Sequence, residues 1–198
     1  MPSSPKLSRP QVLRIPAKGT ALLLIDVIND LAFPGSEPLI DQAGQMAIAL
    51  AKLKQRAARA GVAIVYVNDN FGQWRSDFRQ TVAHCTSKGS PGRAVSNRLK
   101  PSERDYFVLK PKHSGFYDTT LETLLDSLKI TRVIVAGMAG NICVLFTAND
   151  AYMRGLRIYA PSDCIVSNTA EDNEHALRQI ELVLKGRTQP SHLIRFTR

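Results

Sequence analysis

The stretch VIVAGMAGNICVLFTANDAYMRG (residues 133–155) changes from a continuous apolar run to a helical pattern across two glycines, Gly137 and Gly140. The apolar run is typical of a strand buried on both faces. The segment from about 142 to 154 is predicted to be a helix, which Gly155 ends. A buried strand followed at once by a helix is typical of the crossover units of a parallel sheet.

The same alternation of strand and helix continues over most of the chain. Apolar runs predict strands at 20–28, 62–68, 106–110, 132–137, 157–161 and 192–196. Apolar residues at three- and four-residue spacing predict helices at about 43–60, 121–128, 142–154 and 170–185. We therefore expect an α/β fold with three layers, α/β/α and Rossmann-like, in which helices cover both faces of a mostly parallel six-stranded sheet.

Length and composition indicate one globular domain. The chain has 198 residues, of which 44% are hydrophobic, which is enough for one sizeable core and short for two. We expect residues 1–18 to be a flexible basic tail and residues 19–198 to form the single domain. The polar segment 69–104 is expected to be part helix and part surface excursion.

The net charge of +9 is concentrated at the two ends of the chain. Residues 1–18 and 185–198 each hold four basic residues and no acidic ones, and removing these eight from the 26 basic residues leaves 18 against 17 acidic. A basic groove for nucleic acid is therefore not expected in the body of the fold. No apolar run approaches the ~18 residues that span a bilayer, so we expect no membrane partner either.

Three cysteines, Cys85, Cys143 and Cys164, are too few and too scattered for a disulfide framework or a zinc site. Reduced thiols and a cytoplasmic location are the simplest interpretation. Free cysteines are mostly small buried side chains, and we expect this of Cys85 and Cys164.

Ligands of parallel sheets bind beyond the carboxyl ends of the strands, and three reactive side chains fall there. Asp26 follows the first predicted strand, Lys110 ends the third, and Cys143 follows the fourth. Asp26 could instead cap the next loop, and either Lys110 or Lys112 could be a solvated surface charge. Together, however, an acid, a cation and a thiol are the parts of a nucleophilic site.

Cys143 is predicted to lie at the start of a helix, where the helix dipole and free N–H groups favour an anion. We expect this position to lower the pKa of the thiol toward a reactive thiolate. The same N–H groups could hold the oxyanion that forms when a thiolate attacks a carbonyl.

Four stretches, in this order and spacing, resemble the isochorismatase-like cysteine hydrolases, a family that includes nicotinamidases, other small-amide hydrolases and true isochorismatases. The resemblance covers roughly residues 19–186. Its marks are LLLIDVINDLAFPG, YVNDNFGQWRSDF, FVLKPKHSGFYDTTLETLL and VAGMAGNICVLFTANDAYMRG.

The resemblance implies a catalytic triad of Asp26, Lys110 and Cys143. It also implies a cis peptide bond between Met138 and Ala139, with the backbone amides of Ala139 and Cys143 forming the oxyanion hole. Family members are commonly dimers or tetramers, so a homo-oligomer is expected.

Two departures from the family pattern bear on the substrate. Ile28 stands where many relatives have Gln, which predicts a more apolar pocket. Nicotinamidases carry an Asp and His metal cluster after the second strand, whereas this chain has Asp69 there without a histidine. We therefore expect no metal and no other cofactor.

The expected partner is a small-molecule substrate, with Trp74, Phe116, Asn29 and Asn70 as candidate substrate-binding residues. Our main hypothesis is that the chain hydrolyses a small amide or a related carbonyl C–N bond through a thioester. Two alternatives stay open: a vinyl-ether hydrolase that uses Asp26 as an acid, and a relative that binds small molecules without turnover.

Overall fold

The computed structural model describes residues 11–33, 36–72 and 77–198. Its strands are β1 (Leu13–Pro16), β2 (Thr20–Ile25), β3 (Ala63–Asp69), β4 (Tyr106–Lys110), β5 (Arg132–Met138), β6 (Arg157–Tyr159), β7 (Ile165–Val166) and β8 (Ile194–Thr197). Its α-helices are α1 (Glu37–Ala60), α2 (Phe78–Cys85), α3 (Arg93–Arg98), α4 (Leu121–Ser127), α5 (Leu145–Met153) and α6 (Ala170–Leu182). A single turn of π-helix, Gly140–Val144, leads into α5.

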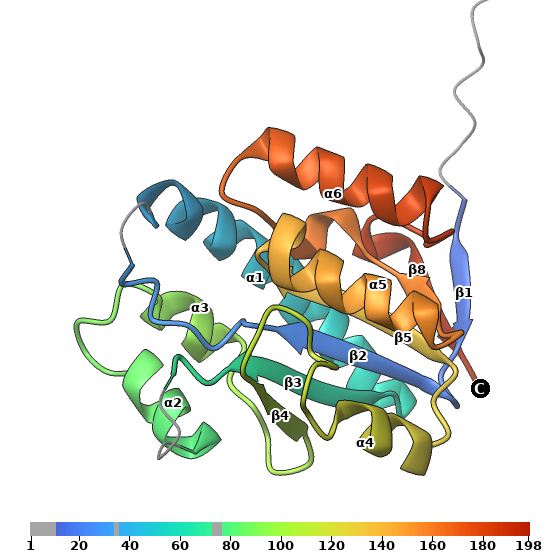
Figure 1. Cartoon of the computed structure of the whole chain (residues 1–198), viewed down its shortest axis with the longest axis horizontal. Helices are drawn as coiled ribbons and strands as arrows, with labels where there is room; N and C mark the ends of the chain where they lie inside the picture. The colour runs from blue at the N-terminus through green and yellow to red at the C-terminus, as the bar shows by residue number, and fades with distance from the viewer. Residues whose placement is uncertain (1–10, 34–35, 73–76) are drawn as a thin grey trace, which may run out of the picture.

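The main sheet has six parallel strands, five of them in the order β4-β3-β2-β5-β6, with β7 paired to the end of β5. Figure 1 shows α4 and α5 in front of this sheet and α1 behind it. The predicted α/β fold with a mostly parallel six-stranded sheet is therefore confirmed.

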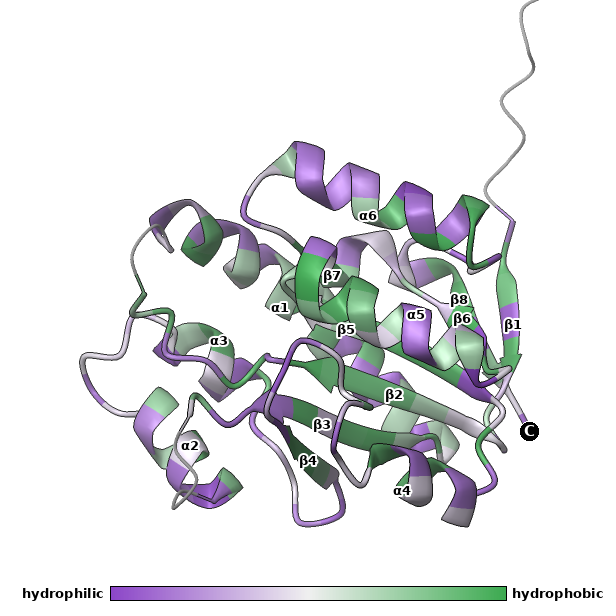
Figure 2. Ribbon diagram, viewed as in Figure 1, coloured by the Kyte–Doolittle hydropathy of each residue, from purple (hydrophilic) through white to green (hydrophobic). Residues whose placement is uncertain are grey.

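Both faces of the central strand are buried because successive side chains of a strand point to opposite sides. Leu22 and Leu24 on β2 pack in the core layer that includes α1, whereas Leu23 and Ile25 pack in the layer that includes α4 and α5. In Figure 2, β2 is largely green, while the helices mix green and purple, as expected for elements with one buried side.

The structure corrects two expectations about the ends of the chain. The predicted strand at 192–196 exists as β8, but it pairs with β1 in a separate two-stranded sheet, and β7 is the sixth strand of the main sheet. The segment 1–18 was expected to be a loose tail, yet Leu13–Pro16 forms β1. The buried side chain of Ile15 and the backbone pairing with β8 hold it. Residues 1–10 lie outside the described part.

The segment after β3 contains two short helices, α2 and α3, that pack near the loop following β2. In the described part of the chain, no helix is long and apolar enough to cross a membrane. The parallel arrangement places the carboxyl ends of β2, β3, β4 and β5 at one edge of the sheet, and the reactive side chains lie there.

Candidate active site

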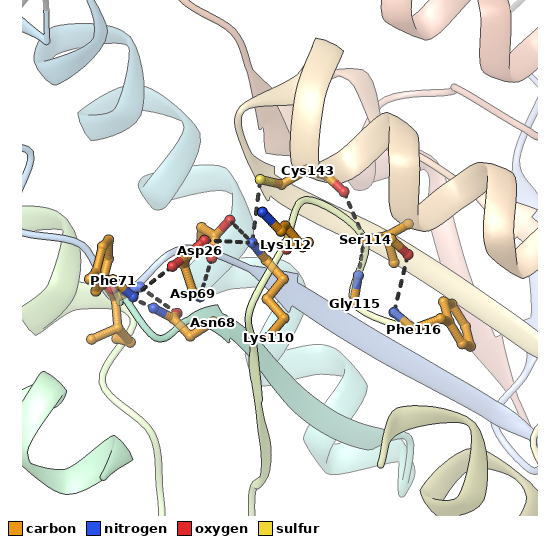
Figure 3. A network of polar contacts seen from close by, with 12 residues as sticks. Asp26, Asn68, Asp69, Phe71, Lys110, Lys112, Ser114, Gly115, Phe116 and Cys143 are labelled. Carbon is orange, nitrogen blue, oxygen red and sulfur yellow. Dashed lines mark hydrogen bonds and ion pairs between the residues drawn. The ribbon is translucent and has the colours of Figure 1, made fainter. Parts of the chain in front are cut away.

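Three strand ends bring Asp26, Lys110 and Cys143 together. The ammonium nitrogen Nζ of Lys110 lies 2.9 Å from Oδ2 of Asp26 and 3.4 Å from Sγ of Cys143. Figure 3 shows Lys110 reaching up from β4 between the carboxylates and the thiol. The three residues come from segments more than thirty positions apart, so only the crossover topology joins them.

Asp26 follows directly after β2 and is held by the neighbouring strand β3. Its backbone N–H donates to the carbonyl of Val67, and its Oδ1 accepts the backbone N–H of Asp69 at 2.6 Å. Burial raises the pKa of Asp26, and the charge and hydrogen bond of Lys110 offset that rise only in part. A carboxylate in this state is a better proton acceptor than an exposed one.

Lys110 is completely buried and makes several polar contacts. Besides Asp26 and Cys143, its Nζ donates to the carbonyl of Lys112 at 3.2 Å and lies 3.4 Å from Oδ2 of Asp69. Burial lowers the pKa of Lys110, but the charge of Asp26 and of the other neighbours outweighs it, so the pKa is raised and the side chain stays cationic. The side chain of Lys112 is exposed, so Lys110 is the lysine of this cluster.

The turn between β5 and Cys143 depends on two glycines that other parts of the chain approach closely. Gly137 has a φ of 120°, and a Cβ there would lie 2.0 Å from the carbonyl oxygen of Ile25. At Gly140 a Cβ would lie 2.7 Å from the hydroxyl of Ser167. That hydroxyl accepts the N–H of Asn141, which fixes the first turn of the π-helix. The expected cis peptide bond is present between residues 138 and 139.

A second set of hydrogen bonds fastens the loop after β4 to the helix that carries Cys143. The hydroxyl of Thr147 donates to the carbonyl of Cys143 and accepts the N–H of Gly115. Ser114 donates to Asp150 on the same helix. Figure 3 shows Ser114 and Gly115 of this loop near Cys143. These hydrogen bonds set the distance between the loop after Lys110 and the helix that carries Cys143.

The expected lowering of the Cys143 pKa is wrong. Burial, followed by the charge of Asp26, raises the pKa of this thiol to about 12, and Lys110 offsets only part of the rise. The start of a helix lowers a thiol pKa only slightly. Burial of the thiolate away from water and the nearby negative charge of Asp26 raise the pKa by more. Cys143 is therefore a neutral thiol with the carboxyl group of Asp26 beside it.

A cavity of about 290 Å³ opens onto this cluster. Its polar lining comes from Asp26, Asn29, Asp69, Cys143 and Asn168, and its apolar lining from Phe33, Leu39, Phe71, Met138, Ala139 and Ile142. Larger surface hollows exist elsewhere, but they contain none of the three reactive side chains. The cavity has room for a small molecule.

The four candidate substrate-binding residues have different outcomes. Asn29 lines the cavity, although its Oδ1 already accepts the N–H of Leu31. Asn70 is not part of the lining, and its Oδ1 caps a turn by accepting the N–H of Gly72. Phe116 is buried in the core, with the guanidinium of Arg154 4.6 Å from its ring centroid. Trp74 lies outside the described residues.

Sequence reasoning missed two roles at the end of β3. Asn68 is fully buried, and its side-chain amide exchanges two hydrogen bonds with the backbone of Ile28, which holds the loop that begins at Asp26. Ile28 is itself buried outside the cavity, so its apolar side chain does not shape the pocket. Asp69 was weighed only as a metal ligand, yet its side chain contacts Lys110. The sequence signal that could have revealed these roles was the presence of polar residues in an otherwise apolar strand.

The described residues contain no group of three or more His, Cys, Asp or Glu side chains arranged to hold a metal ion. Asp69, the residue considered as a metal ligand from the sequence, faces Lys110 and is followed two positions later by Phe71. An ammonium group thus lies near this carboxylate.

Fold and site together define an α/β protein with a buried acid–lysine–cysteine cluster at the carboxyl edge of a parallel sheet. The chain belongs to the isochorismatase family, because the model of the isochorismatase domain matches residues 20–188. It is 44% identical over 164 residues to the isochorismatase family protein YaaI of Bacillus subtilis, a match that covers 83% of this chain and 90% of YaaI.

One further match is in sequence and one is in fold. Ureidoacrylate amidohydrolase RutB of Azorhizobium caulinodans is 27% identical over 172 residues, covering 73% of this chain and 75% of RutB. The crystal structure of a cysteine hydrolase from Pseudomonas syringae superimposes with a TM-score of 0.73 at 22% identity, covering 94% of this chain and 95% of that one. The protein is thus a member of a hydrolase family whose relatives include amidohydrolases.

Proposed function

We propose that this chain hydrolyses a small amide, or a related carbonyl C–N bond, through a thioester on Cys143. The observation that carries the proposal is the position of Lys110 Nζ, 2.9 Å from Asp26 and 3.4 Å from the thiol of Cys143, two residues that both line a small cavity. An amidohydrolase among the relatives supports the same bond type.

In the first half of the proposed reaction, Sγ of Cys143 forms a bond to the substrate carbonyl carbon while its proton passes to Asp26. The carbonyl electron pair moves to oxygen, and the backbone amides of Ala139 and Cys143 donate to that oxyanion. The C–N bond then breaks, and the proton on Asp26 goes to the leaving nitrogen. Lys110 keeps its charge and stabilises the anionic neighbours.

In the second half, a water molecule attacks the thioester while Asp26 accepts a proton from it. The C–S bond breaks, the acid product leaves, and the sulfur recovers its proton from Asp26. A thiol with a raised pKa suits this sequence, because the proton moves to Asp26 as the new bond forms and no free thiolate has to exist beforehand.

The test is ammonia release from a panel of small primary amides and ureido compounds. Cys143→Ala should lower turnover by about a thousandfold or more. Cys85→Ala, which removes a buried thiol outside the cavity, should retain it. Rapid quenching should show the mass of one acyl group on the peptide that contains Cys143.

Two results would contradict the proposal. Full turnover of an amide by Cys143→Ala would show that no thioester on Cys143 is needed, and turnover of a vinyl ether by that variant would favour the mechanism in which Asp26 alone supplies the acid. Binding of small molecules by the wild type without turnover of any amide would favour the non-catalytic relative.

A further inference from the structure

Asp69 is the second carboxylate of the cavity and is more exposed than the first. Its side chain has 31% of its surface accessible, compared with 7% for Asp26. Both residues line the cavity. Asp26 is largely covered by its contacts with Lys110 and the backbone, so Asp69 is the carboxylate with more surface open to a bound molecule.

The hydrogen bonds of Asp69 leave part of its acceptor capacity toward the cavity. Oδ1 accepts the backbone N–H of Phe71 at 2.6 Å, and Oδ2 has only the long 3.4 Å contact with Lys110 among the described residues. An ionised carboxylate offers about four lone-pair sites. Figure 3 shows Asp69 on the same side of Lys110 as Asp26, pointing toward the reactive cluster.

Among the described residues, the charges around the cavity do not balance. Asp26 and Asp69 both line it, the described cation that they contact is the buried ammonium group of Lys110, which is not part of the lining, and the thiol is neutral. The other described lining residues are amides or apolar side chains, and none carries a positive charge. An anionic substrate would therefore meet an excess of negative charge and no described cation on the cavity wall.

We propose that Asp69 is a specificity-determining residue that accepts a hydrogen bond from an N–H group of the substrate, so that the site selects cationic or neutral amides over anionic ones. This inference names the substrate class and rests on the proposed function. The substrate carries the reacting carbonyl near Cys143 and a donor group, best an ammonium, near Asp69. The apolar wall formed by Phe33, Leu39 and Phe71 receives the carbon chain between them.

A purely positioning role is the competing explanation, because Asp69 also contacts Lys110. The two roles differ in how they depend on substrate charge. Loss of a positioning contact lowers turnover of every substrate by the same factor, whereas loss of a recognition contact lowers it most for the cation and raises it for the anion.

The experiment uses three amides of nearly equal size: β-alaninamide, butyramide and succinamate, which are cationic, neutral and anionic. Ammonia release by the wild type should give the highest kcat/KM for β-alaninamide, a lower value for butyramide and the lowest for succinamate. Asp69→Asn should lower the value for β-alaninamide about ten- to a hundredfold, the range expected for a hydrogen bond to a charged group, and should raise it for succinamate. Asp41→Asn, which removes an exposed carboxylate on α1, is the matched control and should leave the order unchanged.

Binding to the Cys143→Ala variant separates this inference from the proposed chemistry. The thermal shift of that variant with each amide should follow the same order, whatever the wild type turns over. The expected shifts without any wild-type ammonia release would support the inference and contradict the thioester proposal. Shifts as large for succinamate as for β-alaninamide, no shift with any of the three, or an equal loss for all three in Asp69→Asn would overturn the inference.

Discussion

Lys110 forms an ion pair with Asp26 in which the Nζ to Oδ2 distance is 2.9 Å and neither side chain has more than 7% of its surface exposed. Each partner stabilises the other, because either one alone would be an uncompensated charge buried in the protein. The same lysine also faces the sulfur of Cys143. The pair therefore connects the stability of the site to its reactivity, and the two can be tested separately.

Asp26→Asn should make Cys143 more reactive toward an alkylating agent while abolishing amide turnover. The carboxylate is one of the two main causes that raise the pKa of the thiol to about 12, and its removal leaves burial opposed by Lys110. The thiolate fraction near pH 8 should rise, by about tenfold for each unit by which the pKa falls. Turnover should fall because an amide cannot accept the proton.

Iodoacetamide labelling followed by peptide mass spectrometry measures this. Cys85, whose pKa burial raises to about 11, is the internal reference and should label at the same rate in both proteins. If Cys143 labels more slowly in Asp26→Asn, then Asp26 lowers the thiol pKa and the electrostatic interpretation is wrong.

Lys110→Met should destabilise the fold in a way that depends on pH. Without the ammonium, Asp26 is an unpaired buried carboxylate, and the loss at pH 8 should be about 3–5 kcal/mol. The pKa of Asp26 is already raised in the folded wild type and should rise further in the variant. The folded variant then binds the proton of Asp26 more tightly than the unfolded chain does. Its stability therefore falls as pH rises from the unfolded pKa of Asp26 through the folded pKa, and is regained as pH falls through the folded pKa.

Urea unfolding at pH 5 and pH 8 checks this prediction. Lys112→Met, which changes an exposed lysine in the same loop and keeps the backbone carbonyl that Lys110 uses, should change stability by less than about 0.5 kcal/mol at either pH. An equal loss at both pH values in Lys110→Met would mean that Asp26 does not carry the penalty.

Gly137→Ala should be far more destabilising than Gly155→Ala, although both glycines have positive φ. The new Cβ at Gly137 would lie 2.0 Å from the carbonyl oxygen of Ile25 in the central strand, whereas at Gly155 there is no heavy atom of the described residues within 4 Å. We expect about 1–2 kcal/mol at Gly155 from backbone strain alone. At Gly137 we expect about 4 kcal/mol or more, or failure to fold.

Thermal or urea unfolding measures the loss of stability in the two variants. If Gly137→Ala does not fold, the yields of folded protein are compared instead. Similar losses for the two variants would show that the close approach at Gly137 relaxes easily. The contact between β5 and β2 would then not be what requires a glycine.

The sequence by itself determined the alternation of buried strands and helices, because those patterns are local and repeat with the period of each element. It also indicated Asp26, Lys110 and Cys143, since each stands where an apolar strand ends or a helix begins. These three positions needed no knowledge of distant contacts. The isochorismatase family followed from the same stretches, which the family match includes.

The tertiary structure decided what depends on residues far apart in the chain. Pairing placed the last strand, β8, against β1 and made the short β7 part of the main sheet. Burial and the charge of Asp26 together raised the pKa of Cys143 against the local tendency of its helix. Phe116, which the sequence suggested for substrate binding, is buried in the core, whereas Asp69 lines the cavity. Electrostatics and packing sum over neighbours in space, and a local sequence pattern contains none of those distances.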